Sequence, residues 1–150
     1  MELRERLQAE VKEAMKAKAA ARLSTLRMMG AAIKDREIAA RGDGAEVGEA
    51  DILALLGKMV KQRQESARAY AEGGRPELEA KELAEIAVIT GFLPQQLTGA
   101  EVEAAIAAAV AETGASSIKD MGRVMGALKA KYTGQMDFGA AGALIKTRLG

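Results

Sequence analysis

Two adjacent serines and a nearby lysine, Ser116, Ser117 and Lys119, are the residues of this chain that most suggest catalysis. Some amidases use two serines and a lysine as their catalytic groups. Those enzymes present the three residues from separate segments of a long Gly- and Ser-rich domain, whereas here all three lie in one short segment. Ser117 also suits the N-cap of a helix, where such a residue stabilises by about 1 kcal/mol. We therefore interpret Ser117 as a capping residue and predict no catalytic residue.

The composition excludes several kinds of site. The chain of 150 residues contains no Cys and no His, so it has neither disulfides nor thiolate and imidazole ligands for zinc. A cysteine nucleophile and a histidine base are absent for the same reason. No nucleotide-binding glycine loop is present either. We predict no cofactor and no bound metal.

Basic residues are grouped along the chain, although its net charge is only +1. Residues 113–150 contain six Lys and Arg opposed only by Asp120 and Asp137, and such a cluster can contact phosphates. For any single lysine, the alternative is an ordinary solvated surface. Aromatic residues make up only 3% of the chain, so RNA binding would depend on backbone contacts and not on base stacking. The predicted phosphate-binding residues are Lys119, Arg123, Lys129, Lys131, Lys146 and Arg148, together with Arg27, Lys34, Lys58, Lys61 and Arg63.

Two glycines, Gly122 and Gly126, lie four positions apart in a predicted helix. Each costs about 1 kcal/mol relative to Ala inside a helix, so a compensating contact is expected. A tight contact with another helix of the same domain is the favoured explanation. Close approach of a phosphate backbone is the alternative, because Lys119 and Arg123 lie beside the glycines.

The elements that position these residues are helices. Apolar residues recur at helical spacing almost throughout, for example at Leu3, Leu7, Val11 and Met15, and no strand alternation appears. Helix starts are predicted at Pro76, Thr98, Ser117 and Asp137, and stops at Gly73-Gly74, Gly91, Gly114 and Gly134. Met121, Met125 and Leu128 are predicted to be core residues. The sequence predicts an all-α protein with a four-helix N-terminal domain (residues 1–94), a hinge at "FLPQQLTG", and a three-helix C-terminal domain (residues 95–150).

Three segments together resemble the GatB/YqeY family over essentially the whole chain. They are "KQRQESARAYAEGGRPELEAKELAEIAVITGFLPQQL", "ETGASSIKDMGRVMGALKAKYTGQMD" and "ALIKTRL". Free-standing YqeY-type members are the more similar ones. The resemblance implies likeness to the helical tail of the GatB subunit of glutamine-dependent amidotransferases, which follows a catalytic cradle and contacts tRNA. It also implies a carbon–nitrogen ligase label, with glutamine as amido donor, for a chain that lacks the catalytic part.

The basic clusters predict an RNA-binding accessory protein, and the resemblance implies folded tRNA as its ligand. One alternative is a component of an amidotransferase that needs a partner subunit, and another is a protein-interaction module. An amidotransferase or an aminoacyl-tRNA synthetase would be the expected protein partner. The N-terminal sequence interleaves acids and bases and resembles neither a signal nor a transit peptide. The longest uncharged run, residues 86–100, is too short and broken to span a bilayer. A cytoplasmic location without membrane association is therefore expected.

Overall fold

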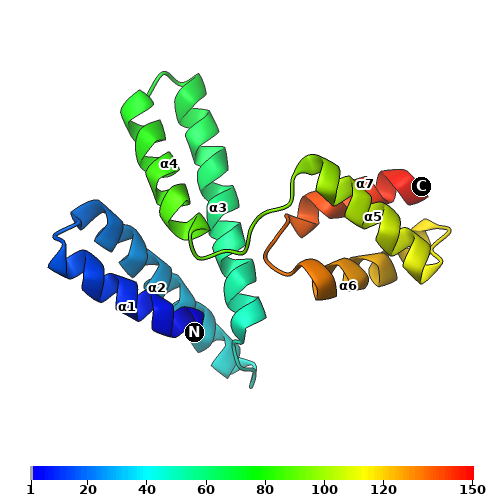
Figure 1. Cartoon of the computed structure of the whole chain (residues 1–150), viewed down its shortest axis with the longest axis horizontal. Coiled ribbons are helices and arrows are strands. Elements are labelled where there is room, and N and C mark those ends of the chain that lie inside the picture. Colours follow the sequence, from blue (N-terminus) through cyan, green and yellow to red (C-terminus); the bar gives the residue numbers. More distant parts are fainter. Residues whose placement is uncertain (1) are drawn as a thin grey trace. The chain divides into compact units, whose positions relative to one another are not determined.

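The computed structural model describes residues 2–150 of the chain. Over these residues it contains seven α-helices, one 3₁₀ helix and no β-strand (Figure 1). This architecture confirms the predicted all-α class. The elements are α1 (Leu3–Lys16), α2 (Ala20–Gly42), α3 (Glu49–Glu72), α4 (Pro76–Thr90), α5 (Gly99–Thr113), η1 (Ile118–Asp120), α6 (Met121–Tyr132) and α7 (Phe138–Leu149).

Contacts between Cα atoms group the chain into two compact units. The boundary between them in the sequence lies between Leu93 and Pro94. Helices α1–α4 belong to the first unit, and α5–α7 with η1 belong to the second. The predicted organisation into independent domains, residues 1–94 and 95–150, stays a prediction. Phe92 and Leu93, at the start of the segment predicted as a hinge, pack in the core of the first unit. The rest of the segment is held within the second unit: the Leu97 N–H donates to the Gln135 carbonyl at 2.9 Å, and the Gln96 side chain donates to the Gly134 carbonyl at 2.6 Å.

The first unit is built from two helical hairpins, α1–α2 and α3–α4 (Figure 1). The α3–α4 pair has the more extensive contact, and α2 packs against both α3 and α4. The core between them includes Leu26, Met29, Ile52, Leu56 and Ile89, all fully buried. Burying such side chains is the main driving force that holds the hairpins together.

Polar contacts also join α1 to later helices of this unit. The Leu3 N–H donates to the Glu49 carboxylate at 3.2 Å, so the first residue of α3 caps the start of α1. Farther along α1, the Arg6 guanidinium donates to the Gly91 carbonyl at 2.6 Å and lies 4.4 Å from the centre of the Phe92 ring. The chain leaving α4 is therefore fastened to α1 just before the second unit begins.

The second unit packs α5, α6 and α7 around a small core. Ile106, Val124, Leu128 and Ile145 are its large buried side chains. Leu128 is buried as predicted, but Met121 and Met125 are only half-buried. The correction has a geometric reason: both thioether methyl groups pack over Gly142 on α7, at the edge of the core, while Val124 between them points into its centre.

Local signals set most of the helix ends. At the start of α5, the Thr98 hydroxyl accepts from the Glu101 N–H at 3.2 Å, and the Glu101 carboxylate accepts from the Thr98 N–H at 2.9 Å. The bond from the Thr98 N–H lowers the pKa of Glu101, and the Thr98 hydroxyl adds to this effect. Gly114 ends α5 with φ of 66°, a conformation that favours glycine. The predicted apolar stripe of α1 ends before its last turn, since Met15 is 53% exposed.

Candidate nucleic-acid interface

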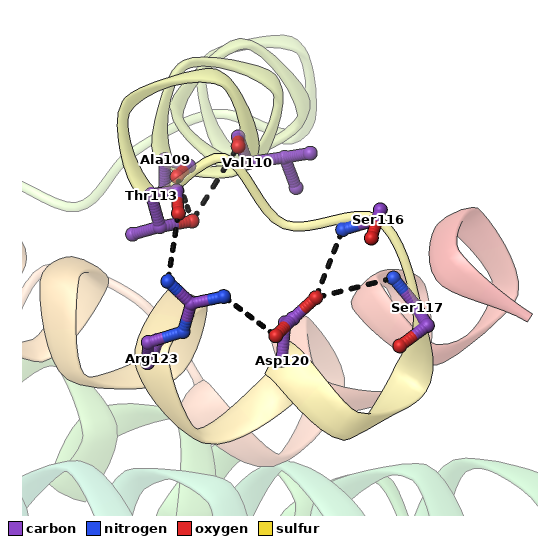
Figure 2. A network of polar contacts seen from close by, with 7 residues as sticks. All are labelled: Ala109, Val110, Thr113, Ser116, Ser117, Asp120 and Arg123. Carbon is purple, nitrogen blue, oxygen red and sulfur yellow. Dashed lines mark hydrogen bonds and ion pairs between the residues drawn. The ribbon is translucent and has the colours of Figure 1, made fainter.

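The start of α6 is joined to the end of α5 by a polar network around Asp120 and Arg123 (Figure 2). The Asp120 carboxylate accepts from the N–H groups of Ser116 and Ser117, at 3.0 and 3.3 Å. Its other oxygen accepts from the Arg123 guanidinium at 2.5 Å, and the same guanidinium donates to the Thr113 carbonyl at 2.9 Å. The Ser116 bond, followed by the Arg123 bond, lowers the pKa of Asp120 from its ordinary value of 3.8 to about 2.

This network bears on two predictions about individual residues. Ser117 is the N-cap residue of η1, as predicted, with Asp120 at N3, and the Asp120 carboxylate makes the capping bonds by accepting from the Ser116 and Ser117 N–H groups. Arg123 is not an unengaged surface cation, because its guanidinium bridges Asp120 and the last carbonyl of α5 (Figure 2). Its side chain is nevertheless 60% exposed, so Arg123 first positions the start of α6 and contributes only a partly neutralised charge to the surface.

The other basic residues of the second unit are exposed. Lys119 precedes α6 in η1, Lys129 and Lys131 lie in the last turn of α6, and Lys146 and Arg148 lie in the last turn of α7. The Lys131 ammonium lies 5.8 Å from the centre of the Tyr132 ring. Four of these side chains make no hydrogen bond or ion pair among the described residues: Lys119, Lys129, Lys146 and Arg148.

The exposed face of α6 is unusually smooth. Gly122 and Gly126 are exposed, and a Cβ added at either one would have no heavy atom within 4 Å. The favoured explanation for these glycines, a tight helix contact within the domain, is therefore wrong. Lys129 is seven residues from Gly122, which places it at one end of the same face, and Lys119 lies just before the other end. We call this surface, Lys119, Gly122, Gly126 and Lys129, the α6 face.

In the first unit, four of the five predicted phosphate-binding residues are exposed: Arg27, Lys34, Lys58 and Lys61. Arg63 is the exception. Its guanidinium pairs with the Glu85 carboxylate of α4 at 3.1 Å and donates to the Met59 carbonyl at 3.1 Å. The two paired side chains are only 15% and 13% exposed. Arg63 is therefore a structural residue between α3 and α4, and the prediction that it contacts phosphate is corrected.

Residue patterns did not reveal an open groove of about 590 Å³ between the starts of α5 and α7. Leu97, Val102, Met136 and Leu144 supply much of its apolar lining, and Glu103 and Asp137 add carboxylates. No basic residue lines it, so it does not suit a phosphate. Its walls come from segments some 40 positions apart in the chain, and helical periodicity within either segment carries no signal of the groove.

Residues 2–150 contain no cluster of three acidic side chains that could hold a metal ion. Within the same residues, none of the helices combines the length and the apolar character needed to cross a bilayer.

The YqeY family model, described as Yqey-like protein, matches residues 4–149. The chain therefore belongs to the YqeY-like protein family, which confirms that part of the resemblance noted in the sequence.

Curated relatives are fungal proteins named "Altered inheritance of mitochondria protein 41, mitochondrial". The Saccharomyces cerevisiae (strain YJM789) protein is 31% identical over 97 residues, which cover 65% of this chain and 51% of that protein. The Lachancea thermotolerans protein is 32% identical over 97 residues, which again cover 65% of this chain and 51% of that protein. The Meyerozyma guilliermondii protein is 38% identical over 87 residues, covering 58% of this chain and 44% of that protein. The chain thus spans about half the length of these relatives.

These names overturn the predicted cytoplasmic location, because the relatives are named as mitochondrial proteins. The prediction was a default that followed from the mixed charges of the N-terminal residues and the lack of a long apolar run. Neither feature says in which compartment the relatives of a helical protein function.

Proposed function

We propose that this chain is an accessory protein that binds folded RNA, with tRNA as its ligand, by contacts to the phosphate backbone. The observation that supports this proposal most strongly is the α6 face. Two glycines of α6 there cost up to about 1 kcal/mol each relative to Ala, and no atom within 4 Å of a Cβ at either position accounts for that cost. A ligand that approaches the helix backbone closely would account for it.

The chemistry of the α6 face favours a phosphate backbone as that ligand. Lys119 and Lys129 are exposed at its two ends and have no carboxylate partner among the described residues. Between them the glycines leave the helix without side chains that would hold a nucleic acid at a distance. Folded RNA is recognised largely through shape and contacts to phosphate and sugar, which require a basic, sterically open surface and no aromatic platform.

The choice of tRNA over other folded RNAs is supported by the resemblance to the tail of the GatB amidotransferase subunit. A similar fold does not by itself establish a shared ligand, so the test must measure tRNA binding directly. In this proposal, any carbon–nitrogen ligase chemistry belongs to a partner, an amidotransferase or an aminoacyl-tRNA synthetase. The chain alone is expected to release no ammonia from glutamine above the buffer rate.

The decisive experiment is a salt series with the full-length protein and a fluorescently labelled tRNA transcript. The Lys119→Ala, Lys129→Ala double variant removes the two ends of the α6 face. The Lys12→Ala, Lys81→Ala variant removes two exposed charges of the first unit and serves as the matched control. We expect the first variant to reduce the slope of log K against log salt by roughly two units, about one per lost phosphate contact, and the control to change it little.

Two results would contradict the proposal. One is a wild-type protein that does not bind tRNA with a measurable salt dependence. The other is a Lys119, Lys129 double variant that binds like the control while circular dichroism shows both to be folded. The groove between α5 and α7 would then favour the second candidate function, a protein-interaction module, because its lining is apolar and acidic.

A further inference from the structure

An exposed row of basic residues runs along α2 on the side away from the core. Leu26 and Met29 are buried on one side of this helix, whereas Arg27, Lys34 and Arg41 are exposed. Residues seven apart differ by only about 20° around an α-helix, so the three cations form a nearly straight line. The spacing between neighbours is about 10.5 Å, from seven residues at 1.5 Å each. We call these three residues the α2 row.

Two exposed apolar residues lie beside the line of these cations. Exposed Ala31 lies between Arg27 and Lys34, and Ile38, which is 55% exposed, lies between Lys34 and Arg41. An ordinary solvated helix face gains stability from acids placed three or four residues from its bases. Glu37 is such a neighbour, three positions after Lys34 and four before Arg41, but its carboxylate pairs with Arg4 of α1 at 3.4 Å and with neither cation of the row.

The two acids of α2 lie to the sides of the row. Asp35 is one position after Lys34, about 100° around the helix. Glu37 is on the other side, and its carboxylate pairs with Arg4 at 3.4 Å. Arg41 borders a cavity of about 240 Å³ that Glu37 also lines, so it is the cation of the row with the most acidic surroundings.

We infer that the α2 row is a second phosphate-binding surface of this protein, which adds Arg41 to the residues predicted from sequence. The inference rests on the proposed function, since both need a folded RNA as ligand. The side chains of the three residues make no hydrogen bond or ion pair among the described residues, so their full charge faces solvent. A straight row of cations on a rigid helix complements the regular charge of a nucleic-acid backbone.

The spacing supports a polyanion as the occupant. Neighbouring cations stand about one Debye length apart at 0.1 M salt, so they repel one another weakly in the free protein. A nucleic-acid duplex carries a phosphate every few Å along its axis, so each cation of the row can reach a different phosphate. An isolated acidic side chain on a protein would engage only one of the three.

The test uses the full chain, the labelled tRNA transcript and an Arg27→Ala, Lys34→Ala, Arg41→Ala variant. Its matched control is Lys12→Ala, Arg36→Ala, Lys81→Ala, which also removes three exposed charges, one of them from α2. We expect the row variant to lose roughly two to three units of salt slope. Each lost unit corresponds to about one decade in K between 1 M and 0.1 M salt, so binding should weaken by roughly 100-fold or more at 0.1 M.

A second pair of variants tests position without removing a cation. Ala31→Glu places an acid inside the row, whereas Ala39→Glu places the same acid on α2 about 80° away. Both positions are exposed, and Glu is nearly as good a helix former as Ala. Binding should weaken clearly more for Ala31→Glu than for Ala39→Glu. Among single changes of the row, Arg41→Ala should have the smallest effect because of its acidic surroundings.

The outcomes separate this inference from the proposed function. If the wild type binds tRNA and the α6-face variant is impaired, but the row variant matches its three-charge control, the inference alone is wrong. The row would then be a solvated face or a contact for an acidic protein. If the wild type shows no salt-dependent tRNA binding, both fail. The inference is supported if the row variant loses more salt slope and more tRNA affinity than its three-charge control, and if Ala31→Glu binds tRNA more weakly than Ala39→Glu.

Discussion

The guanidinium of Arg63 on α3 lies 3.1 Å from the carboxylate of Glu85 on α4, in a pair that is almost entirely buried. Removing one partner of such a pair leaves the other charge buried without compensation. We expect Arg63→Ala to lower the free energy of unfolding by roughly 3 kcal/mol, measured by urea titration, and to leave tRNA affinity unchanged where the variant is folded. An Arg63→Ala protein of wild-type stability that binds tRNA weakly would restore Arg63 as a phosphate contact.

The double change Arg63→Met, Glu85→Leu is the control for this prediction. Replacing both charges by apolar side chains of similar size removes the stranded carboxylate, and such exchanges are often neutral or stabilising. The double variant should therefore be clearly more stable than Arg63→Ala.

The Asp120 carboxylate is expected to make the stability of the second unit depend on pH in the acid range. Its pKa is lowered from 3.8 to about 2, chiefly by the Ser116 N–H and then by Arg123. The charged form is thus favoured in the folded state, so its contribution is fully present above about pH 4 and is lost as pH falls toward 2. The stability gap between wild type and Asp120→Asn should close over that interval. A gap that stays constant from pH 5 to pH 2 would contradict this assignment.

Leu128 and Met125 should respond differently to truncation, although both lie on the inner side of α6. Leu128 is 1% exposed, and Leu128→Ala should cost about 2–5 kcal/mol, the range for buried large residues. Met125 is half-buried at the edge of the core beside Gly142, so Met125→Ala should cost less than the lower end of that range. Urea unfolding of the two variants measures both values. Equal losses would show that Met125 is a true core residue after all.

The glycines of the α6 face should separate stability from binding. Gly122→Ala and Gly126→Ala meet no atom within 4 Å, so each should stabilise the fold by up to about 1 kcal/mol. The same methyl groups would hold an approaching backbone away from the helix, so tRNA binding should weaken. Gly57→Ala is the control, because Gly57 lies in α3 and is equally open. Alanines at 122 and 126 that bind tRNA as Gly57→Ala does would remove the main support for the α6 face.

The sequence alone determined where most of the helices begin and end, because caps and breakers act within a few residues, whereas the start of α1 is capped by Glu49 from α3. Thr98 with Glu101, Pro76 at the start of α4 and Gly114 after α5 all act as predicted. Asp137 caps α7 as predicted, because its carboxylate accepts from the N–H groups of Gly139 and Ala140 in the first turn. Ser117 shows the limit of this reasoning, since a serine and an aspartate three positions later can bond in either direction.

Only the tertiary structure decided which basic residues are available to a ligand. Helical spacing already placed Arg63 four residues from the buried Met59, yet the spacing could not identify Glu85, 22 positions away, as its partner. Likewise, Arg123 reaches the Thr113 carbonyl only because η1 turns the chain back onto α5. Periodicity assigns residues to a face of one helix, whereas the packing of neighbouring helices decides which faces are covered. That packing left Gly122 and Gly126 uncovered by any neighbouring helix. It also placed the side chain of Val124, and not that of Met125, in the core.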